Sequence, residues 1–281
     1  MSILQLIFIA LVQGITEWLP ISSSAHVLLA SDWFGLDGEE ELLINAMAHL
    51  GTLGALLVYF YRDVWRAIIG SAELVSAPLS GKALSANGKL ALMIVAATPI
   101  ALGVSGAFEI FASQGLQDML RNAWVVAGAT IFFGALLWWA DIKGGTMRTE
   151  ADMTLKDAIL IGSVQAVAAL IPGTSRSGVT MTLSRALGFE RTEAARFSML
   201  IGAPILAAVG AYAFLKLSTG EGTGAATLND GLMVAGLSFV SGYASIWMLM
   251  SLLKRMSFLP FVIYRFLLGG ALLLMVPHIV V

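Results

Sequence analysis

Long apolar stretches separated by short polar segments dominate the hydrophobic pattern of this chain. A helix needs about 20 apolar residues to cross the hydrocarbon core of a bilayer, which is roughly 30 Å thick. The pattern therefore predicts an all-α polytopic membrane protein, one integral membrane domain over residues 1–281. Six stretches are long enough to span: Leu42 to Tyr61, Leu90 to Ser113, Ala123 to Ala140, Phe197 to Leu215, Gly231 to Leu253, and Phe258 to about Val276.

Two further apolar segments, Ser2 to Val12 and Ala158 to Ile171, are too short to cross. Each leads to a proline, Pro20 or Pro172, which a run of small hydroxyl residues follows. Proline lacks an N–H and clashes with the preceding turn, so a helix is expected to break there and restart. These segments predict two re-entrant helix-turn-helix elements, over about residues 2–34 and 157–189.

The two broken segments resemble each other. Sliding the sequence by 152 residues aligns five identities in seventeen positions, among them Pro20 with Pro172 and Ser23 with Ser175. Three predicted spans follow each segment, so the chain divides into halves of about residues 1–145 and 150–281. Paired broken helices that meet near the midplane are typical of inverted-repeat transporters. The sequence thus predicts an inverted-topology repeat whose two turns lie tip to tip.

The distribution of charge supports this topology. Only 12% of the 281 residues are charged, against about 25% in an average soluble domain, so a soluble protein is excluded. Cytoplasmic loops of membrane proteins carry an excess of Lys and Arg. Of sixteen basic residues, twelve fall on one predicted face: Arg62, Arg66, Lys82, Lys89, Lys143, Arg148, Lys156, Arg185, Arg191, Arg196, Lys254 and Arg255. The opposite, outer face carries Asp37, Glu39, Glu40, Glu41 and the loop from Ser218 to Asp230.

Charge and composition also exclude classes of function. The formal net charge of −2 provides no basic surface for a nucleic-acid backbone, so nucleic acid is not an expected partner. The chain has no cysteine, which excludes disulfides, thiolate metal sites and thiol nucleophiles.

The first broken segment carries one set of candidate catalytic groups. Gln13 and Glu17 are four residues apart, which places both oxygen-bearing side chains on one helical face, suited to a hard divalent cation. After Pro20, the serines and His26 sit at a helix restart, where a Ser23–His26 pair backed by Glu17 can activate an oxygen nucleophile. The competing interpretation is that the serines, Ser22, Ser23 and Ser24, only cap a helix.

The second broken segment carries an anion-binding pattern. Arg176 offers a planar fork of donors that matches phosphate oxygens, and a helix N-terminus adds free N–H groups. Its hydroxyl neighbours are Thr174, Ser175, Ser177 and Thr180. This combination predicts a phosphate cradle. The alternative is an ion pair between Arg176 and Glu17 that only stabilises the fold.

Other ionisable residues in the apolar segments are expected to lie outside the site. His49, at the start of a span, could line the site, although packing is the preferred interpretation. Glu109 is expected to lie at the membrane interface. Arg265 is expected to pair with Glu109 or to extend its charged end toward water.

Taken together, the motifs resemble the bacterial undecaprenyl-diphosphate phosphatase family, also called bacitracin-resistance proteins. They are Gln13-x-x-x-Glu17, Pro20-x-Ser22-Ser23-Ser24-x-His26 and Pro172-Gly-x-Ser175-Arg176-Ser177-Gly178. The resemblance covers essentially the whole chain, with Gln13 standing where many members carry Glu. It implies hydrolysis of undecaprenyl diphosphate to the monophosphate, dependence on magnesium or calcium, and an inner-membrane enzyme whose site opens to the periplasm.

Roles follow for the named residues. Arg176 with Ser22, Ser24, Thr174, Ser175, Ser177 and Thr180 is predicted to bind the diphosphate. Ser23 is the preferred nucleophile, His26 its acid or base, and Glu17 with Gln13 orients His26 or binds the cation. His26 or water as the nucleophile stays open, as do a homodimer and a polyprenyl-phosphate carrier that uses the same inverted-repeat site.

Overall fold

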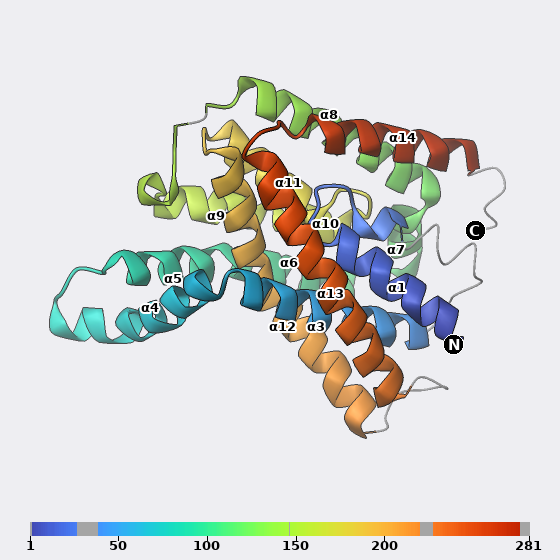
Figure 1. Cartoon of the computed structure of the whole chain (residues 1–281), viewed down its shortest axis with the longest axis horizontal. Coiled ribbons are helices and arrows are strands. Elements are labelled where there is room, and N and C mark those ends of the chain that lie inside the picture. The colour runs from blue at the N-terminus through green and yellow to red at the C-terminus, as the bar shows by residue number, and fades with distance from the viewer. Residues whose placement is uncertain (1, 27–38, 146, 220–226, 276–281) are drawn as a thin grey trace.

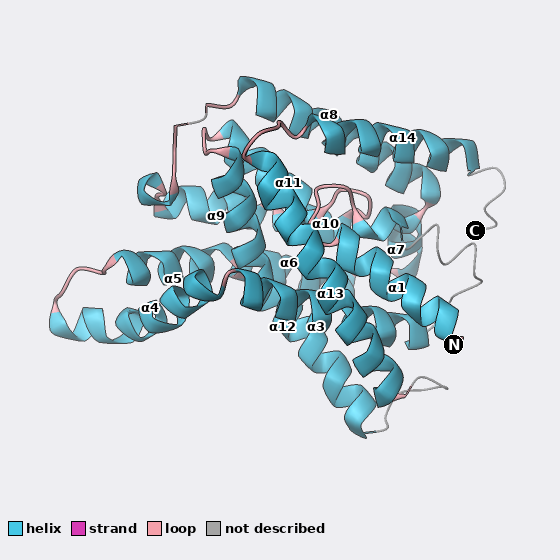
Figure 2. Cartoon of the chain, viewed as in Figure 1, coloured by secondary structure: helices cyan, strands magenta, loops and turns pink. Residues whose placement is uncertain are grey.

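The computed structural model describes residues 2–26, 39–145, 147–219 and 227–275 (Figure 1). Within these ranges the regular structure is helical, apart from one isolated bridge between Arg148 and Phe189 (Figure 2). The helices are α1 (Ile3–Thr16), α3 (Glu39–Tyr59), α4 (Tyr61–Ser80), α5 (Ala86–Ala97), α6 (Pro99–Phe111), α7 (Gln114–Arg121), α8 (Ala123–Lys143), η1 (Glu150–Asp152), α9 (Leu155–Ser163), α10 (Gln165–Leu170), α11 (Arg176–Ala186), α12 (Arg191–Thr219), α13 (Leu228–Leu253) and α14 (Leu259–Met275).

Five apolar helical stretches in the described residues are long enough to cross a membrane, and each matches a predicted span. They are Leu42–Tyr59, Ala86–Phe111, Ala123–Lys143, Arg191–Thr219 and Leu228–Leu253. The second consists of α5 and α6, because Pro99 starts a new helix directly after Thr98. The sixth predicted span corresponds to α14, whose seventeen described residues fall just below that length. The chain is an all-helical, multi-pass membrane protein.

Both short apolar segments form helices that stop before a turn and restart after it. α1 runs past the predicted Val12 to Thr16, whereas the second segment is divided into α9 and α10 at Val164. Helix resumes at Ser23 in the first segment and at Arg176 in the second. The two restarts are therefore 153 residues apart, one more than the sequence alignment indicates, so Ser23 corresponds in position to Arg176.

Some predicted features lie outside the described residues: the end of the first broken segment at 27–34, Asp37, the loop residues 220–226 and Val276.

The helices pack in a way that places the two turns at the centre. α13 lies against α3 and α1, α12 lies against α3, and α14 lies along α8 (Figure 1). The largest cluster of buried apolar side chains includes Trp18, Leu19 and Ile21 of the first turn together with Met199 of α12 and Phe258 before α14. Burial of apolar side chains on all sides thus fixes the first turn in the interior.

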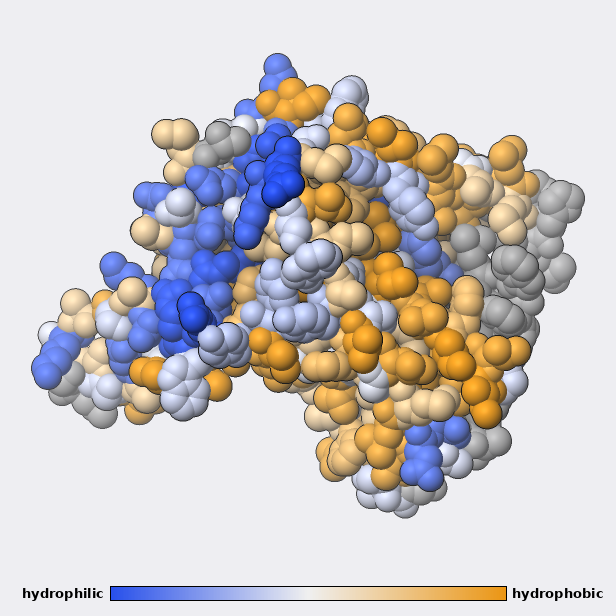
Figure 3. Space-filling model, viewed as in Figure 1, coloured by the Kyte–Doolittle hydropathy of each residue, from blue (hydrophilic) through white to orange (hydrophobic). Residues whose placement is uncertain are grey.

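Polar side chains gather at one end of the molecule. In Figure 3 the hydrophilic surface lies on the side of α4 and α9, whereas apolar surface covers much of α1, α13 and α14. Arginines that the charge count assigns to the inner face pair with acids here. The ion pairs are Arg66–Asp63, Arg66–Glu150, Arg148–Asp157, Arg185–Asp141, Arg191–Asp141, Arg196–Asp63, Arg196–Glu150 and Arg196–Glu193.

Glu150 ties three parts of this network together. Its carboxylate accepts hydrogen bonds from Arg66 on α4 and Arg196 on α12, while η1 carries it between the two halves. Partial burial would raise the pKa of Glu150, but the hydrogen bonds and charges of the two arginines outweigh burial and lower that pKa. The ionised carboxylate is thus favoured in the folded protein.

We expect Glu150→Gln to lower the free energy of unfolding by about 1.5 to 3 kcal/mol at pH 7, because the three charge-assisted hydrogen bonds from Arg66 and Arg196 weaken. Because the pKa of Glu150 is lowered in the folded protein, its ionised carboxylate stabilises the fold at pH values above the ordinary pKa of 4.5. This stabilisation is lost as the pH falls through the lowered pKa. The difference between variant and wild type should therefore shrink in acid. Thermal unfolding in detergent from pH 7 to 3 measures this, with exposed Glu109→Gln as the control. A stability difference between Glu150→Gln and wild type that stays constant with pH would contradict this expectation.

Candidate active site

The carboxylate of Glu17 is the hub of the polar interior. Glu17 ends α1 and is buried. Its Oε1 accepts a hydrogen bond of 2.8 Å from Nη2 of Arg176, and its Oε2 accepts one of 2.7 Å from Nε2 of Gln13. The Ser23 hydroxyl donates to Oε2 at 3.4 Å. One carboxylate therefore joins the candidate nucleophile of the first turn to the guanidinium of the second.

Further hydrogen bonds connect the two turns directly. The backbone N–H of Gly173 donates to Oγ of Ser24 at 3.0 Å, and the Ser177 hydroxyl donates to the carbonyl of Leu19 at 2.9 Å. The broken segments, far apart in sequence, thus form one polar site.

Arg176 is held on three sides. Besides its ion pair with Glu17, its guanidinium carbon lies 5.4 Å from the ring centre of buried Trp18, a cation–π contact. Gly202 of α12 leaves the remaining space, because a Cβ built there would lie 1.7 Å from Nη1 of Arg176. The position of the guanidinium therefore depends on the absence of a side chain at residue 202.

The polar side chains of the site fall into two groups, those that are partly exposed and those that are fully buried. Ser23, Ser24, His26, His49 and Arg176 retain exposed surface. The other predicted diphosphate-binding residues are buried: Ser22, Thr174, Ser175, Ser177 and Thr180.

The buried hydroxyls are largely used inside the protein. Thr180 Oγ1 lies 2.6 Å from Oγ of Ser198, and its hydroxyl also lies against the carbonyls of Arg176 and Ser177. Ser175 caps α11 by accepting from the N–H of Gly178. The structure thus gives these hydroxyls a role in shaping the second turn.

His26 does not pair with Ser23 as the sequence spacing suggested. Its Nδ1 lies 2.7 Å from the carbonyl of Ser22, and its Nε2 lies 2.6 Å from the hydroxyl of Tyr264. The two rings are stacked, with an angle of 2° between their planes. Because a carbonyl only accepts, Nδ1 carries the proton, and Nε2 of the neutral ring accepts from Tyr264. The contact with α14 turns the imidazole away from Ser23, whose hydroxyl faces Glu17 instead.

His49 joins the site, although the sequence reading assigned it to packing. Its Nδ1 lies 2.9 Å from Nε2 of Gln13 and 3.5 Å from Oε2 of Glu17. An ionisable side chain within a membrane span is a functional candidate by default, and this signal was available from the sequence. A histidine on α3 thus completes the surroundings of Glu17.

Arg265 differs from expectation, whereas the interfacial position of Glu109 stays a prediction. Glu109 is exposed on α6. Arg265 is fully buried and donates to backbone carbonyls of α8 and of both turns, so it neither pairs with Glu109 nor reaches water. The turns leave backbone carbonyls that helical N–H groups do not satisfy, and the guanidinium of Arg265 donates hydrogen bonds to them.

The residues around Glu17 fit a divalent cation that shares its ligands with a substrate. No group of three or more His, Cys, Asp or Glu side chains gathers within the residues the structure describes. Mg²⁺, however, is commonly bound through one or two carboxylates together with substrate phosphates. Glu17 supplies the carboxylate, and Gln13 and His49 lie beside it.

An apolar groove leads to the site along α1 and α14. Its volume is about 550 Å³. Phe8, Leu11, Val12, Ile15, Thr16, Leu19, Ile21, His26, Pro260, Phe261 and Tyr264 line it. The polar end is formed by His26 and Tyr264, and Ala25 separates His26 from the serine run. The groove can therefore hold an apolar chain whose polar head reaches the first turn.

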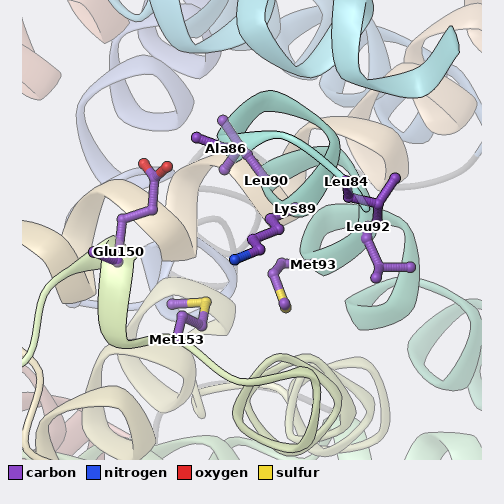
Figure 4. Close-up of a pocket in the computed structure, with 9 residues that line it drawn as sticks. Leu84, Ala86, Lys89, Leu90, Leu92, Met93, Glu150 and Met153 are labelled. Carbon is purple, nitrogen blue, oxygen red and sulfur yellow. The ribbon is translucent and has the colours of Figure 1, made fainter. Parts of the chain in front are cut away.

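A second pocket lies at the polar end of the molecule, between α5 and the segment that begins at Glu150 (Figure 4). Lys89 and Glu150 line it together with apolar side chains of Leu90, Met93 and Met153. Because no predicted site residue contributes to its lining, the catalytic groups do not open into this pocket.

Comparison with known proteins shows the family of this chain. The family model described as "Bacitracin resistance protein BacA" matches residues 6–271. The undecaprenyl-diphosphatase of Hyphomonas neptunium is 63% identical over 278 residues, 99% of this chain and 98% of that protein. The undecaprenyl-diphosphatases of Maricaulis maris and Saccharophagus degradans are 48% and 42% identical, over 97% and 98% of this chain and 98% and 99% of those proteins. With its two turns joined through Glu17 and a match along nearly its full length, the chain belongs to the bacitracin resistance protein family.

Proposed function

We propose that the chain hydrolyses undecaprenyl diphosphate to undecaprenyl phosphate and inorganic phosphate. The reaction returns the lipid carrier to cell-wall synthesis and gives resistance to bacitracin. The observation that carries this proposal is the junction at Glu17, where a hydroxyl and a guanidinium meet one carboxylate. An apolar groove ends nearby at His26, three residues after Ser23. Relatives with this activity in their names match almost the entire chain.

Binding of the substrate divides between a charged and an apolar part. Arg176 would bind the diphosphate oxygens, since a guanidinium fork matches their geometry. Accessible Ser24 contacts Gly173 of the second turn and could add a further hydrogen bond to the diphosphate. The groove along α1 and α14 would receive the first isoprene units. A lipid diphosphate could thus reach the turns from the hydrocarbon core without leaving the bilayer.

The chemistry begins at the Ser23 hydroxyl, our preferred nucleophile. Glu17 is the only carboxylate that a described hydrogen bond links to Ser23, so it serves as the base that accepts the hydroxyl proton. Arg176 stabilises the charge that develops on the transferring phosphoryl group. As the Ser23 oxygen bonds to the terminal phosphorus, the bond from that phosphorus to undecaprenyl phosphate would break. Water would then hydrolyse the phosphoserine, release inorganic phosphate and restore the Ser23 hydroxyl with the proton held by Glu17. His26 stands with Tyr264 at the mouth of the groove and could act as an acid there only with a proton on Nε2 in place of the hydrogen bond from Tyr264.

We further propose that Glu17, Gln13 and His49 hold a magnesium or calcium ion. Such an ion supplies charge neutralisation to the diphosphate when it is bound. The residues themselves hold the carboxylate in place, because Gln13 donates to Glu17 while His49 lies against both.

The membrane arrangement is also proposed. α14 would complete a sixth crossing, and the two broken segments would form re-entrant hairpins of an inverted repeat. The paired arginines at the polar end support a cytoplasmic location for that end. The site would then open to the periplasmic side of the inner membrane. A homodimer stays a prediction.

Purified protein in detergent, given undecaprenyl diphosphate and magnesium, should release inorganic phosphate. Release should stop on removal of divalent ions with EDTA and return when magnesium or calcium is added. Inorganic pyrophosphate should be a poor substrate because it cannot occupy the apolar groove. An absence of phosphate release, together with movement of the lipid across vesicle membranes, would replace hydrolysis by the polyprenyl-phosphate carrier.

Ser23→Ala should reduce phosphate release by at least about 1,000-fold while leaving the binding of the lipid diphosphate intact, because only the attacking oxygen is removed. Steady-state assays and equilibrium binding of a fluorescent polyprenyl diphosphate measure the two effects. Exposed Ser218→Ala on α12 is the matched control. Turnover near that of wild type would exclude Ser23 as the nucleophile and favour His26 or water.

Gly202→Ala should lower turnover by about 100-fold, because the new methyl group displaces the guanidinium of Arg176 from Glu17. The end of a flexible side chain can yield, so the variant should still fold, but its melting temperature should fall because the Glu17–Arg176 ion pair is disrupted. Gly236→Ala on α13 is the control, since a Cβ there meets no atom within 4 Å. Unchanged turnover in Gly202→Ala would show that the position of Arg176 is not critical.

A further inference from the structure

Arg265 has an unusual environment for a charged side chain. It lies on α14 and is fully buried, and its described hydrogen bonds all go to backbone carbonyls. A buried cation without a carboxylate partner is costly in a protein that spans a membrane. Its retention therefore calls for a task that a neutral side chain cannot perform.

The carbonyls bound by Arg265 come from three separate parts of the chain. Nε donates to Thr130 of α8 at 2.9 Å. Nη1 donates to Pro20 in the first turn at 3.3 Å and to Thr174 in the second at 3.1 Å. Nη2 donates to Gly173 in the second turn at 3.0 Å and, at 3.4 Å, to a further carbonyl of α8. A single guanidinium thus bridges both broken segments and ties them to a long helix.

The turns need such a donor because their backbones depart from helical geometry. Ser22 and Ser175, which precede the two restarts, have φ values of 72° and 68°, and Gly173 has a φ of 88°. L-residues adopt this left-handed region at a cost and keep it only where surrounding contacts enforce it. Carbonyls released by the turns would be unsatisfied in the interior, and the guanidinium satisfies them in both turns together.

The neighbouring residues make room for this guanidinium. A Cβ built on Gly178 would lie 2.9 Å from Nη1 of Arg265, and one on Gly134 of α8 would lie 3.2 Å from its Cβ. The glycine that closes the Ser175-Arg176-Ser177-Gly178 run is thus accounted for by Arg265. The preceding residue on α14, Tyr264, holds His26, so two adjacent side chains support the site from one helix.

We infer that Arg265 is a positioning residue for hydrolysis, which holds the two turns in register so that Ser23, Glu17 and Arg176 face the same phosphoryl group. The inference rests on the proposed function. It differs from a role in binding, because Arg265 is buried behind the turns and its donors are occupied by the protein.

Arg265→Lys tests this role while keeping the charge. An ammonium presents three donors from a single point and cannot reproduce the planar fork across two turns. We expect kcat to fall at least about 100-fold and KM for undecaprenyl diphosphate to change by less than about threefold, because catalytic geometry is lost and not the binding groove.

Spin labels provide a readout independent of activity. The natural chain has no cysteine, so cysteines placed at exposed Leu4 on α1 and Ala186 on α11 can be labelled selectively. Pulsed electron paramagnetic resonance then reports the distance between the two broken segments. Wild type should give a narrow distribution and Arg265→Lys a broader or shifted one.

Arg185→Lys is the matched control. Arg185 is also fully buried and also donates to backbone carbonyls, but it pairs with Asp141 at the polar end of the molecule. Arg185→Lys should lower thermal stability without altering KM, kcat per folded molecule or the distance distribution. Where Arg265→Lys fails to fold, Gly178→Ala, which pushes on the same guanidinium, should give the same loss of kcat and broader distribution.

The inference is overturned by wild-type kcat in Arg265→Lys, by an unchanged distance distribution, or by equal effects in Arg185→Lys. An inactive wild-type protein would instead overturn the proposed function. In that case a broadened distance distribution in Arg265→Lys would still show that Arg265 holds the two turns in register.

Discussion

The ion pair between Glu17 and Arg176 is the interaction on which the site depends. Each charge alone would be expensive in an apolar interior, and each lies in a turn that could not be buried without a partner. The pair joins the first broken segment to the second, and the hydrogen bonds of Ser24 and Ser177 then align the turns. The long helices serve mainly to enclose this junction. The Thr130 hydroxyl of α8 donates to the carbonyl of Gly173, Gly202 of α12 leaves space for Arg176, and Tyr264 and Arg265 of α14 contact the turns.

Much of this arrangement was predictable from the sequence. Length and hydropathy identified five long apolar helices, and the prolines identified the places where two shorter helices break. Glu17 and Arg176 were recognised as a pair of candidates because charges are rare in apolar segments. The sequence analysis treated an ion pair between them as an alternative to phosphate binding. The structure shows the ion pair, and because the guanidinium retains exposed surface, Arg176 can also bind a phosphate.

The rest depended on contacts between helices distant in sequence. The spacing of Ser23 and His26 correctly placed both on a restarted helix, but Tyr264 of α14 determines where the imidazole points. His49 lies 32 positions beyond Glu17, on another helix, and only packing brings it to the carboxylate. Arg265 could not be placed because its partners are main-chain oxygens, which no pattern of side chains reveals.

The mutual neutralisation of Glu17 and Arg176 has a consequence for selectivity. The Glu17 carboxylate is engaged by the Arg176 guanidinium, and the two opposite charges offset each other. In the proposed mechanism, an incoming anion would compete with the carboxylate for the guanidinium and would thereby free Glu17 to accept a proton from Ser23. Hydrolytic competence would then arise only with a sufficiently anionic headgroup in place, so ordinary phospholipids passing the groove would leave the nucleophile unactivated.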